Sequence, residues 1–207
     1  MKLVKIVLPI LALLVVSCSK NNENSNAMNV KLPIGDHSVL YDYSNLTWKG
    51  QKITGSSHTG NLSFKSAKIK ISEDGIISGN LIIDMNTMTC TDIENSKYNK
   101  YLVDHLKNDD FFSTDKFPES KIKFQSIKRT ENMIEFDGTL TIKNISNPIS
   151  FTANIYESDG KILASSDLVF DRSKFDIRYG SGTFFENLGD DLILDEINIQ
   201  VNLAINQ

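Results

Sequence analysis

The sequence predicts an all-β fold of eight mostly antiparallel strands, arranged as a barrel or a sandwich. Three observations predict it: apolar and polar residues alternate with a period of two, turn sequences recur at hairpin spacing, and a single segment has helical spacing. The alternation is clearest near the C-terminus, where Ile197, Ile199, Val201, Leu203 and Ile205 share one face. Only a strand with one face in solvent needs such a pattern.

Turn sequences separate the strands. Glu73-Asp74-Gly75 and Ser158-Asp159-Gly160 are typical of hairpin turns, and Ser146-Asn147-Pro148 precedes another strand. Together with the alternation, these turns predict strands at 38–49, 60–72, 76–86, 119–129, 132–143, 148–157, 161–170 and 193–205.

One segment interrupts the β pattern. Thr91-Asp92-Ile93-Glu94 has the spacing of a capping box, and Tyr98, Tyr101, Leu102, His105 and Leu106 follow at helical intervals. We therefore expect a helix of about three turns after Thr91. The long stretch 173–191 contains three glycines and Phe184-Phe185, and loops of that length tend to form lids or rims.

The N-terminus has the features of an export signal. Lys2 and Lys5 precede a short apolar run from Ile6 to Val16, which is too short to span a bilayer. Small residues then lead to Cys18, as in the lipobox of bacterial lipoproteins, whose cysteine is lipidated, for instance with palmitate. We predict a signal peptide at 1–17, a flexible polar tether at 18–31 and a barrel domain at 32–207. A plain secretory signal with an incidental cysteine is the alternative.

Charge and sorting signals narrow the location and the partners. The whole chain has a net charge of −4, and removal of the signal leaves 20 basic and 26 acidic residues, a charge of −6. Nucleic acid is therefore not an expected partner, because phosphate binding needs a basic face. Ser19 after the lipidated cysteine suggests an outer-membrane lipoprotein in the cell envelope, and the few acidic residues that follow favour the periplasmic face.

Enzymatic signals are close to background. His37, His58 and His105 lie far apart, none with metal-ligand spacing or a neighbouring cysteine, so no metal site is expected. The chain has no Gly-x-Ser-x-Gly elbow, no phosphate-binding glycine loop and no dinucleotide fingerprint. We expect no cofactor, no catalytic residue and no enzymatic activity. Cys90, left alone after lipidation of Cys18, is interpreted as a buried small hydrophobic residue.

Several landmarks occur in an order that resembles the YceI-like family of exported bacterial proteins. The most specific is His105-Leu106-Lys107 with Phe111-Phe112 after it, followed by Lys116-Phe117-Pro118. Each piece is weak alone, but their order and spacing are specific together. The other landmarks are Leu46-Thr47-Trp48-Lys49-Gly50, His58-Thr59-Gly60, Ile83-Asp84-Met85, Gly138-Thr139-Leu140-Thr141-Ile142 and Asp171-Arg172-Ser173-Lys174-Phe175.

The resemblance implies an eight-stranded, lipocalin-like antiparallel barrel with one short inserted helix. It also implies an apolar channel that binds a polyisoprenoid or a fatty-acid-like lipid. Four polar residues match positions of the family pattern and are candidate ligand contacts, and Phe111, Phe112 and Pro118 match its aromatic corner. The four polar candidates are His58, Asp84, His105 and Arg172. From the residues alone, Arg172 is equally an anchor for an anionic head group or part of a structural ion pair.

Strand alternation selects the residues expected to line the channel. They are Phe64, Phe124, Phe136, Ile142, Phe151 and Ile199. An eight-stranded barrel is about the size that is either filled by side chains or holds one small ligand. Two alternatives therefore stay open: a structural or interaction lipoprotein with a filled barrel, and a lipid-modifying enzyme with a histidine beside a carboxylate in the channel. The sequence does not determine oligomeric state, and a dimer remains open.

Overall fold

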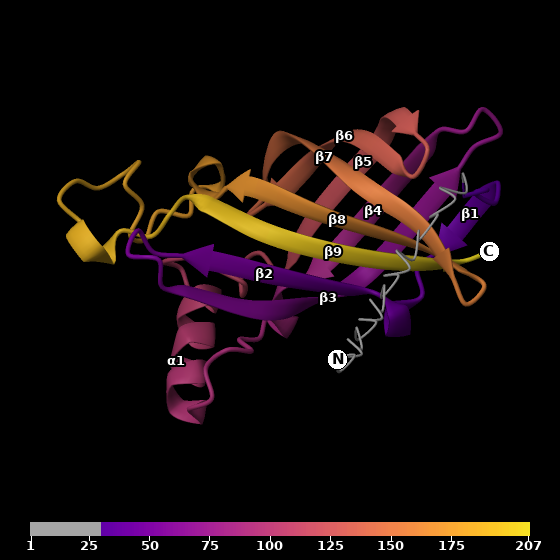
Figure 1. The fold of residues 1–207 in the computed structure, drawn as a ribbon. Coiled ribbons are helices and arrows are strands. Elements are labelled where there is room, and N and C mark those ends of the chain that lie inside the picture. The colour runs from indigo at the N-terminus through magenta and orange to yellow at the C-terminus, as the bar shows by residue number, and fades with distance from the viewer. Residues whose placement is uncertain (1–29) are drawn as a thin grey trace, which may run out of the picture.

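The computed structural model describes residues 30–207, which form one antiparallel sheet that closes on itself. Its strand order is β1-β3-β2-β9-β8-β7-β6-β5-β4, and pairing of β3 with β4 closes the barrel (Figure 1). The strands are β1 Gly35–Ser38, β2 Asn45–Gln51, β3 Ser57–Ile71, β4 Ile77–Asp84, β5 Glu119–Thr130, β6 Met133–Ile142, β7 Ile145–Ser158, β8 Lys161–Asp171 and β9 Glu196–Asn206.

The barrel has eight strand positions because β1 and β2 lie end to end along the same edge of β3 and share one position. β1 pairs with β3 residues 68–71 and β2 with residues 57–62. The prediction of one continuous strand at 38–49 is therefore wrong in detail, since the short 3-10 helix η1 (Tyr41–Tyr43) interrupts it. At this break the Leu40 N–H donates to the carbonyl of Ala204, and the chain bends over the neighbouring strand β9. The fold class, an eight-stranded antiparallel barrel with one helix, is confirmed.

Helix α1 (Ser96–Lys107) begins later than the sequence pattern suggests. Its N-cap is Asn95, whose side chain accepts from the backbone N–H groups of Lys97 and Tyr98. The predicted capping box at Thr91 is wrong, because the Thr91 hydroxyl donates to the Thr59 carbonyl of β3 at 3.3 Å instead. The three-turn length is confirmed.

The two ends of the barrel differ (Figure 1). We call mouth end the end that carries α1, the β2–β3 turn at 52–56 and the loop 172–195, which contains the short helices η3 (Arg172–Phe175) and η4 (Gly189–Asp191). The opposite or far end carries β1 and the C-terminus. The first described residue, Val30, also lies there, held by a hydrogen bond of 2.5 Å from Arg129 Nη2 to its carbonyl.

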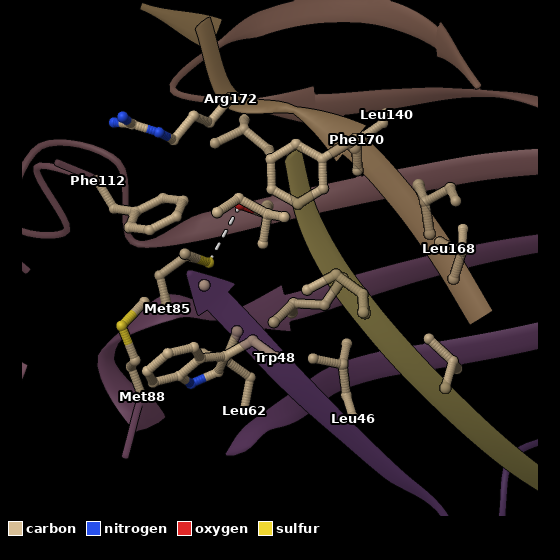
Figure 2. A pocket seen from close by; sticks show the side chains of 18 of the residues that line it. Leu46, Trp48, Leu62, Met85, Met88, Phe112, Leu140, Leu168, Phe170 and Arg172 are labelled. Carbon is tan, nitrogen blue, oxygen red and sulfur yellow. Dashed lines mark hydrogen bonds between the residues drawn. The ribbon is translucent and has the colours of Figure 1, made fainter. Parts of the chain in front are cut away.

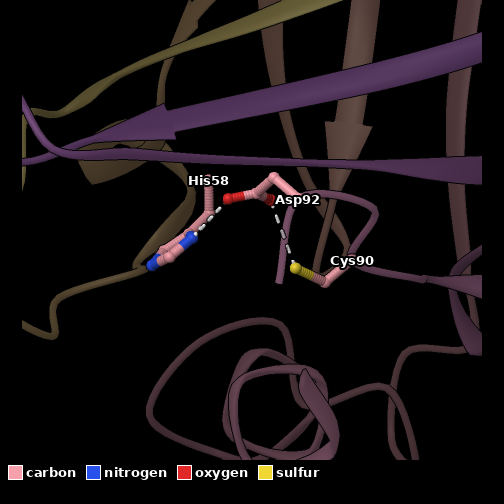
Figure 3. Close-up of side chains that lie close together, drawn as sticks. All are labelled: His58, Cys90 and Asp92. Carbon is pink, nitrogen blue, oxygen red and sulfur yellow. Dashed lines mark hydrogen bonds and ion pairs between the residues drawn. The ribbon is translucent and has the colours of Figure 1, made fainter. Parts of the chain in front are cut away.

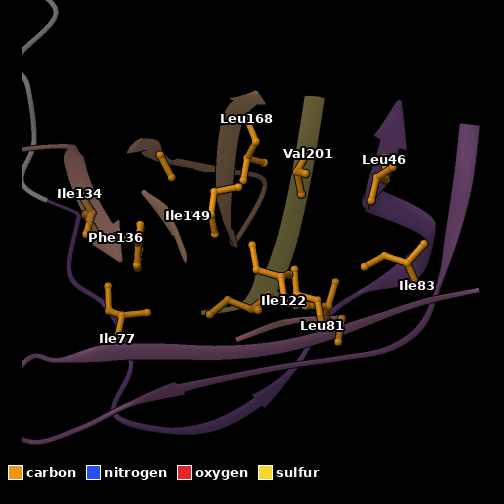
Figure 4. Close-up of a cluster of buried hydrophobic side chains, with 14 of the residues drawn as sticks. Leu46, Ile77, Leu81, Ile83, Ile122, Ile134, Phe136, Ile149, Leu168 and Val201 are labelled. Atoms are coloured by element: carbon orange, nitrogen blue, oxygen red, sulfur yellow. The ribbon is translucent and has the colours of Figure 1, made fainter. Parts of the chain in front are cut away.

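Buried apolar side chains from every strand except β1 meet inside the barrel (Figure 4). Ile134 of β6 is fully buried, and the rings of Phe124, Phe136 and Phe151 pack with centroids 5.1 to 5.4 Å apart. Phe136 and Phe151 are stacked, whereas Phe124 meets both edge-on, which are the favourable arrangements for aromatic pairs.

Some expectations lie outside the described residues. The signal peptide at 1–17, the lipidation of Cys18 and nearly all of the tether at 18–31 fall in this category. Within residues 30–207, no helix is both long and apolar enough to cross a membrane.

Candidate functional site

The barrel encloses a cavity of about 1080 Å³ that runs along its interior to the mouth end. Most of its wall is made by apolar side chains from β2 to β9, with α1 and the loop 172–195 around the opening. Figure 2 shows Leu46, Trp48 and Leu62 on one side of it, facing Leu140, Leu168 and Phe170 on the other. A water molecule takes up about 30 Å³ in the liquid, so the cavity has room for on the order of 30 groups of that size.

Alternation along the strands places most predicted lining residues on the wall. Five of the six line the cavity: Phe124, Phe136, Ile142, Phe151 and Ile199. Phe64 does not; it packs against the buried core next to a β-bulge. The bulge lies between Phe64 and Ser66 and changes the parity of β3, so that the inward residues are even-numbered before it and odd-numbered after it. By this parity Phe64 faces inward as predicted, although it is not part of the cavity wall.

Methionine and tryptophan side chains near the mouth also line the cavity, and the sequence analysis did not select them. Trp48, Met85 and Met88 lie on the wall below Phe112 (Figure 2). The indole Nε1–H of Trp48 donates to the carbonyl of Thr89 at 3.1 Å, which fixes the ring. Trp48 had a readable signal, because it alternates with Leu46 in the same strand. Met85 and Met88 lie in and after the short helix η2 (Met85–Thr87), where no strand periodicity exists.

Asp84 is not on the cavity wall. Its carboxylate accepts from the Asn86 N–H at 3.0 Å and caps η2. The geometry therefore gives this candidate a role at the end of β4, where the chain leaves the sheet.

Helix α1 forms one side of the mouth. Leu102 and Leu106 line the cavity from it, as do Phe111 and Phe112 from the segment that follows. No residue of α1 is fully buried, and Tyr101 keeps 71% of its surface exposed although it also borders the opening. Because no side chain of α1 is fully buried, displacement of its exposed side would disturb few apolar contacts.

Arg172 is 1% exposed and lies under the mouth loop, with its side chain beside the cavity. Its Nη2 also lies 3.3 Å from the Asp195 carboxylate. Burial lowers the pKa of the guanidinium, while Asp195 and Asp171 oppose that shift. Its N–H groups donate to the backbone carbonyls of Ile177, Tyr179, Ile193 and Leu194 at 2.8 to 3.2 Å. These contacts favour the structural interpretation of Arg172, since its donors already hold the loop.

His105 borders the mouth from α1. Its Nε2 lies 3.1 Å from Asp110 Oδ2, and its ring meets Phe111 and Tyr179 edge-on. His105 is thus part of an aromatic cluster with one polar contact at the opening of the cavity.

His58 forms a second polar group at the mouth, and here the structure brings together residues that are distant in the sequence. His58 Nδ1 lies 2.8 Å from Asp92 Oδ2, and Cys90 Sγ donates to Asp92 Oδ1 at 3.3 Å (Figure 3). Burial, reinforced by Asp92, raises the pKa of the Cys90 thiol. Burial opposes ionisation of Asp92, but hydrogen bonds from Thr59 N–H and His58 outweigh it and lower the pKa of this carboxyl group.

Sequence spacing does not reveal this cluster, because 32 positions separate His58 from Cys90. The residues meet since the segment after η2 returns along β3, where Thr89 N–H donates to Asn61 and Thr91 N–H to Thr59. No local spacing rule describes that approach. Cys90 itself is 7% exposed, which agrees with its interpretation as a buried small residue.

Comparison with known protein families identifies the family of this chain. The YceI-like domain matches residues 37–205, nearly all of the described chain. The chain belongs to the YceI-like family. No curated protein sequence matches it.

Several solved structures share the fold. BcnA of Burkholderia cenocepacia superposes with a TM-score of 0.64 at 19% identity, covering 80% of this chain and 98% of that one. A polyisoprenoid-binding domain from Saccharophagus degradans gives 0.59 at 16% identity, over 82% and 97% of the two chains. The YceI protein of Campylobacter jejuni gives 0.52 at 22% identity, over 70% and 84%. At these identities the likeness concerns the barrel fold.

Proposed function

We propose that this protein binds the hydrocarbon chain of a long isoprenoid or a related amphiphilic lipid inside its barrel. The observation that carries the proposal is the apolar cavity of about 1080 Å³ that reaches the mouth end. A filled barrel would leave no such space, so the cavity favours a binding role over a purely structural one. The domain from Saccharophagus degradans, described as polyisoprenoid-binding, has the same fold and supports this ligand class.

Burial of hydrocarbon supplies the driving force. Each buried methylene contributes roughly 0.8 kcal/mol, so a chain of about 20 carbons offers on the order of 16 kcal/mol before costs. Ordering of the chain and loss of its translational freedom offset much of this. Submicromolar affinity is therefore reachable without a strong polar contact, which agrees with a cavity wall that is almost entirely apolar.

The polar end of the ligand would remain at the mouth. His58 and His105 border the opening, with side chains that are 48% and 19% exposed. Arg172 is a poor anchor for an anionic head group, because four backbone carbonyls and Asp195 already occupy its donors. Head-group recognition would accordingly be weak, and chain length would dominate selectivity.

We further propose that the protein is an outer-membrane lipoprotein of the cell envelope, tethered through Cys18 and facing the periplasm. The support is the charged and apolar N-terminal pattern that ends in Cys18. Expression of Cys18→Ala beside the unaltered chain tests this proposal. Loss of membrane fractionation in the variant is expected, and equal fractionation of both chains would contradict it.

A lipid-extraction experiment tests the binding function. Native mass spectrometry of the purified protein, together with uptake of a fluorescent prenyl probe, should show one bound lipid per barrel. Ala164 lines the cavity, so Ala164→Phe should reduce uptake. Val169 lies on the outer face of the same strand, and Val169→Phe, which places the same ring outside the barrel, should leave uptake unchanged. Absence of any co-purified lipid, together with no probe uptake by the unaltered protein, would overturn the proposal.

A lipid-modifying enzyme is the second candidate function, because two histidines at the mouth each lie beside a carboxylate. The pairs are His58 with Asp92 and His105 with Asp110. We propose binding without catalysis. Incubation of bound lipid with the protein, with His58→Ala and with His105→Ala should leave the lipid chemically unchanged in all three cases. Conversion that depends on either histidine would favour the enzyme.

A further inference from the structure

The cluster of His58, Cys90 and Asp92 has the composition of a metal site. Each residue offers one donor atom, and the nitrogen, sulfur and oxygen atoms all lie within 4.8 Å of one another. Figure 3 shows the three side chains converging from two segments, with Asp92 between the other two. Within residues 30–207 it is the only group of three or more His, Cys, Asp or Glu side chains placed to hold a metal ion.

The backbone holds both segments in place before any ion is present. Thr91 N–H donates to the Thr59 carbonyl at 2.9 Å, which joins the Cys90–Asp92 segment to β3 next to His58. Asn99 Nδ2 of α1 donates to the Cys90 carbonyl, also at 2.9 Å, and fixes the segment from its other side. The ligands are therefore attached to two elements that hydrogen-bond to each other, and little ordering remains to be done on binding.

In the metal-free cluster, the thiol proton of Cys90 and the Nδ1 proton of His58 lie where a metal cation would bind. The Cys90 thiol and His58 Nδ1 both face the Asp92 carboxylate. An ion bound by the thiolate, by Nδ1 and by Oδ2 replaces those two contacts, with the thiol proton released to solvent and the imidazole proton moved to Nε2. Asp92 Oδ1 keeps the Thr59 N–H at 2.8 Å, which is the kind of outer contact that orients a ligating carboxylate.

We propose that His58, Cys90 and Asp92 bind one transition-metal ion of the Zn²⁺ class, with a fourth position open to water. The sulfur ligand disfavours Mg²⁺ and Ca²⁺, which prefer oxygen donors, and imidazole suits zinc and its neighbours. One thiolate and one carboxylate balance the charge of a divalent ion. The side chains of His58 and Asp92 are partly exposed, at 48% and 34%, which provides an entry path.

The distances require only a small adjustment. Zinc–sulfur and zinc–nitrogen bonds of about 2.3 and 2.0 Å at a tetrahedral angle separate the two donor atoms by about 3.5 Å. The longest separation in the cluster, at most 4.8 Å, must therefore shorten by about 1 Å or slightly more. Rotation of the exposed His58 side chain can supply this movement without moving β3. The proposal does not depend on lipid binding, because the site needs no lipid group and only His58 of its three ligands borders the cavity.

Cobalt titration of the purified protein tests the site. The protein is reduced with a phosphine, transferred to metal-free buffer under argon and titrated with Co²⁺. One equivalent should produce a thiolate-to-cobalt charge-transfer band and the visible bands of four-coordinate Co²⁺, and Zn²⁺ should displace them. Cys90→Ser should abolish the charge-transfer band, and His58→Gln and Asp92→Asn should weaken Co²⁺ affinity by about 10- to 100-fold.

His37→Gln is the matched control, because His37 bonds the Pro33 carbonyl away from the cluster and should leave the titration unchanged. Circular dichroism verifies that each variant folds, and His58→Gln keeps the test valid if a change at buried Cys90 disturbs folding. A folded, reduced protein without a charge-transfer band would overturn the proposal. A band of undiminished affinity in both His58→Gln and Asp92→Asn would also overturn it, since the thiol would then bind cobalt without the cluster.

Discussion

The mouth end and the far end of the barrel are held by different forces. At the far end the contacts are apolar, with Ile134 fully buried and Phe136 stacked on Phe151. At the mouth end a small apolar cluster of Phe111, Ile142, Phe175 and Ile177 is joined by a polar centre, buried Arg172, which is hydrogen-bonded to the backbone of the loop that borders the opening. Apolar packing is non-directional and proportional to area, whereas a hydrogen-bonded cation fixes one geometry.

This difference suggests that the two ends of the barrel have different roles, ligand entry at the mouth end and stabilisation of the sheet at the far end. A ligand must enter through elements that can move without unfolding the sheet. Helix α1 and the stretch 182–191 of the mouth loop meet that condition, because no residue of either is buried. The strands around Phe136 do not. Substitutions at the two ends should therefore differ in how much unfolding free energy they remove and in how much of the structure they destabilise.

The largest effect is expected from Phe136→Ala. The variant removes a ring that is 4% exposed and packs against Phe124 and Phe151, so it should lower the free energy of unfolding by about 3–5 kcal/mol. Chemical denaturation measures this loss, with the exposed Val169→Ala as a control. A loss below about 1 kcal/mol would mean that the far end does not carry the stability of the barrel.

Arg172→Met should have the next largest effect, and a more local one. The variant keeps the length of the side chain but leaves four backbone carbonyls without their donor. Each unsatisfied buried group costs about 1–3 kcal/mol, yet the loop can detach and hydrate, so we expect a global loss of about 2–3 kcal/mol.

Hydrogen exchange distinguishes this local effect from a global one. In Arg172→Met, amides of residues 176–195 should exchange much faster, while those of β6 and β7 change only as far as the global stability does. Arg178→Met, at an exposed arginine of the same loop, is the control. Equal acceleration in the loop and in β6 would contradict the proposed difference between the two ends.

Sequence periodicity predicted the strands of the barrel well, because apolar and polar side chains alternate every two residues in a strand with one solvent-exposed face. Ile197 to Ile205 and Phe136 to Ile142 followed the rule, and all their inward members line the cavity or the core. The rule failed where the backbone departs from a regular strand. It missed the break at Tyr41–Tyr43 and the bulge beside Phe64, since both depend on pairing with distant strands.

The candidate site was less predictable than the fold. The capping-box spacing at Thr91 misled because Thr91 bonds to Thr59 of β3, which is distant in the sequence, through both its backbone N–H and its hydroxyl. Arg172 was equally consistent with a ligand anchor and an ion pair until its carbonyl partners became visible. Polar side chains take their roles from long-range contacts, whereas inward apolar residues take theirs from local periodicity.

Gly79→Ala tests the packing between the two ends and should have an intermediate effect. A Cβ at Gly79 would lie 2.1 Å from Phe124 Cζ, so the ring must move against Phe136 and Phe151. We expect a loss of about 1–3 kcal/mol by denaturation. Gly50→Ala is the matched control, because its new Cβ would meet Ile197 at 3.7 Å, an ordinary contact. Equal losses in both variants would show that strand flexibility, and not the ring, sets the cost.

The smallest effect is expected from Glu119→Gln at the mouth-side end of β5, and it should depend on pH. Lys65 Nζ lies 2.7 Å and Lys121 Nζ 2.9 Å from the Glu119 carboxylate, and the hydrogen bond from Lys65 is the main cause that lowers the pKa of Glu119. A folded-state pKa below the unfolded value means that the ion pairs stabilise the fold above the unfolded pKa and cease to do so as pH falls through the folded pKa.

The difference in unfolding free energy between the unaltered protein and Glu119→Gln should thus be greatest near neutral pH and vanish in acid. High salt should shrink it as well, because the pairs are exposed and screened. A difference that persisted unchanged in acid would assign the effect to packing, and the contrast between a polar mouth and an apolar far end would lose this support.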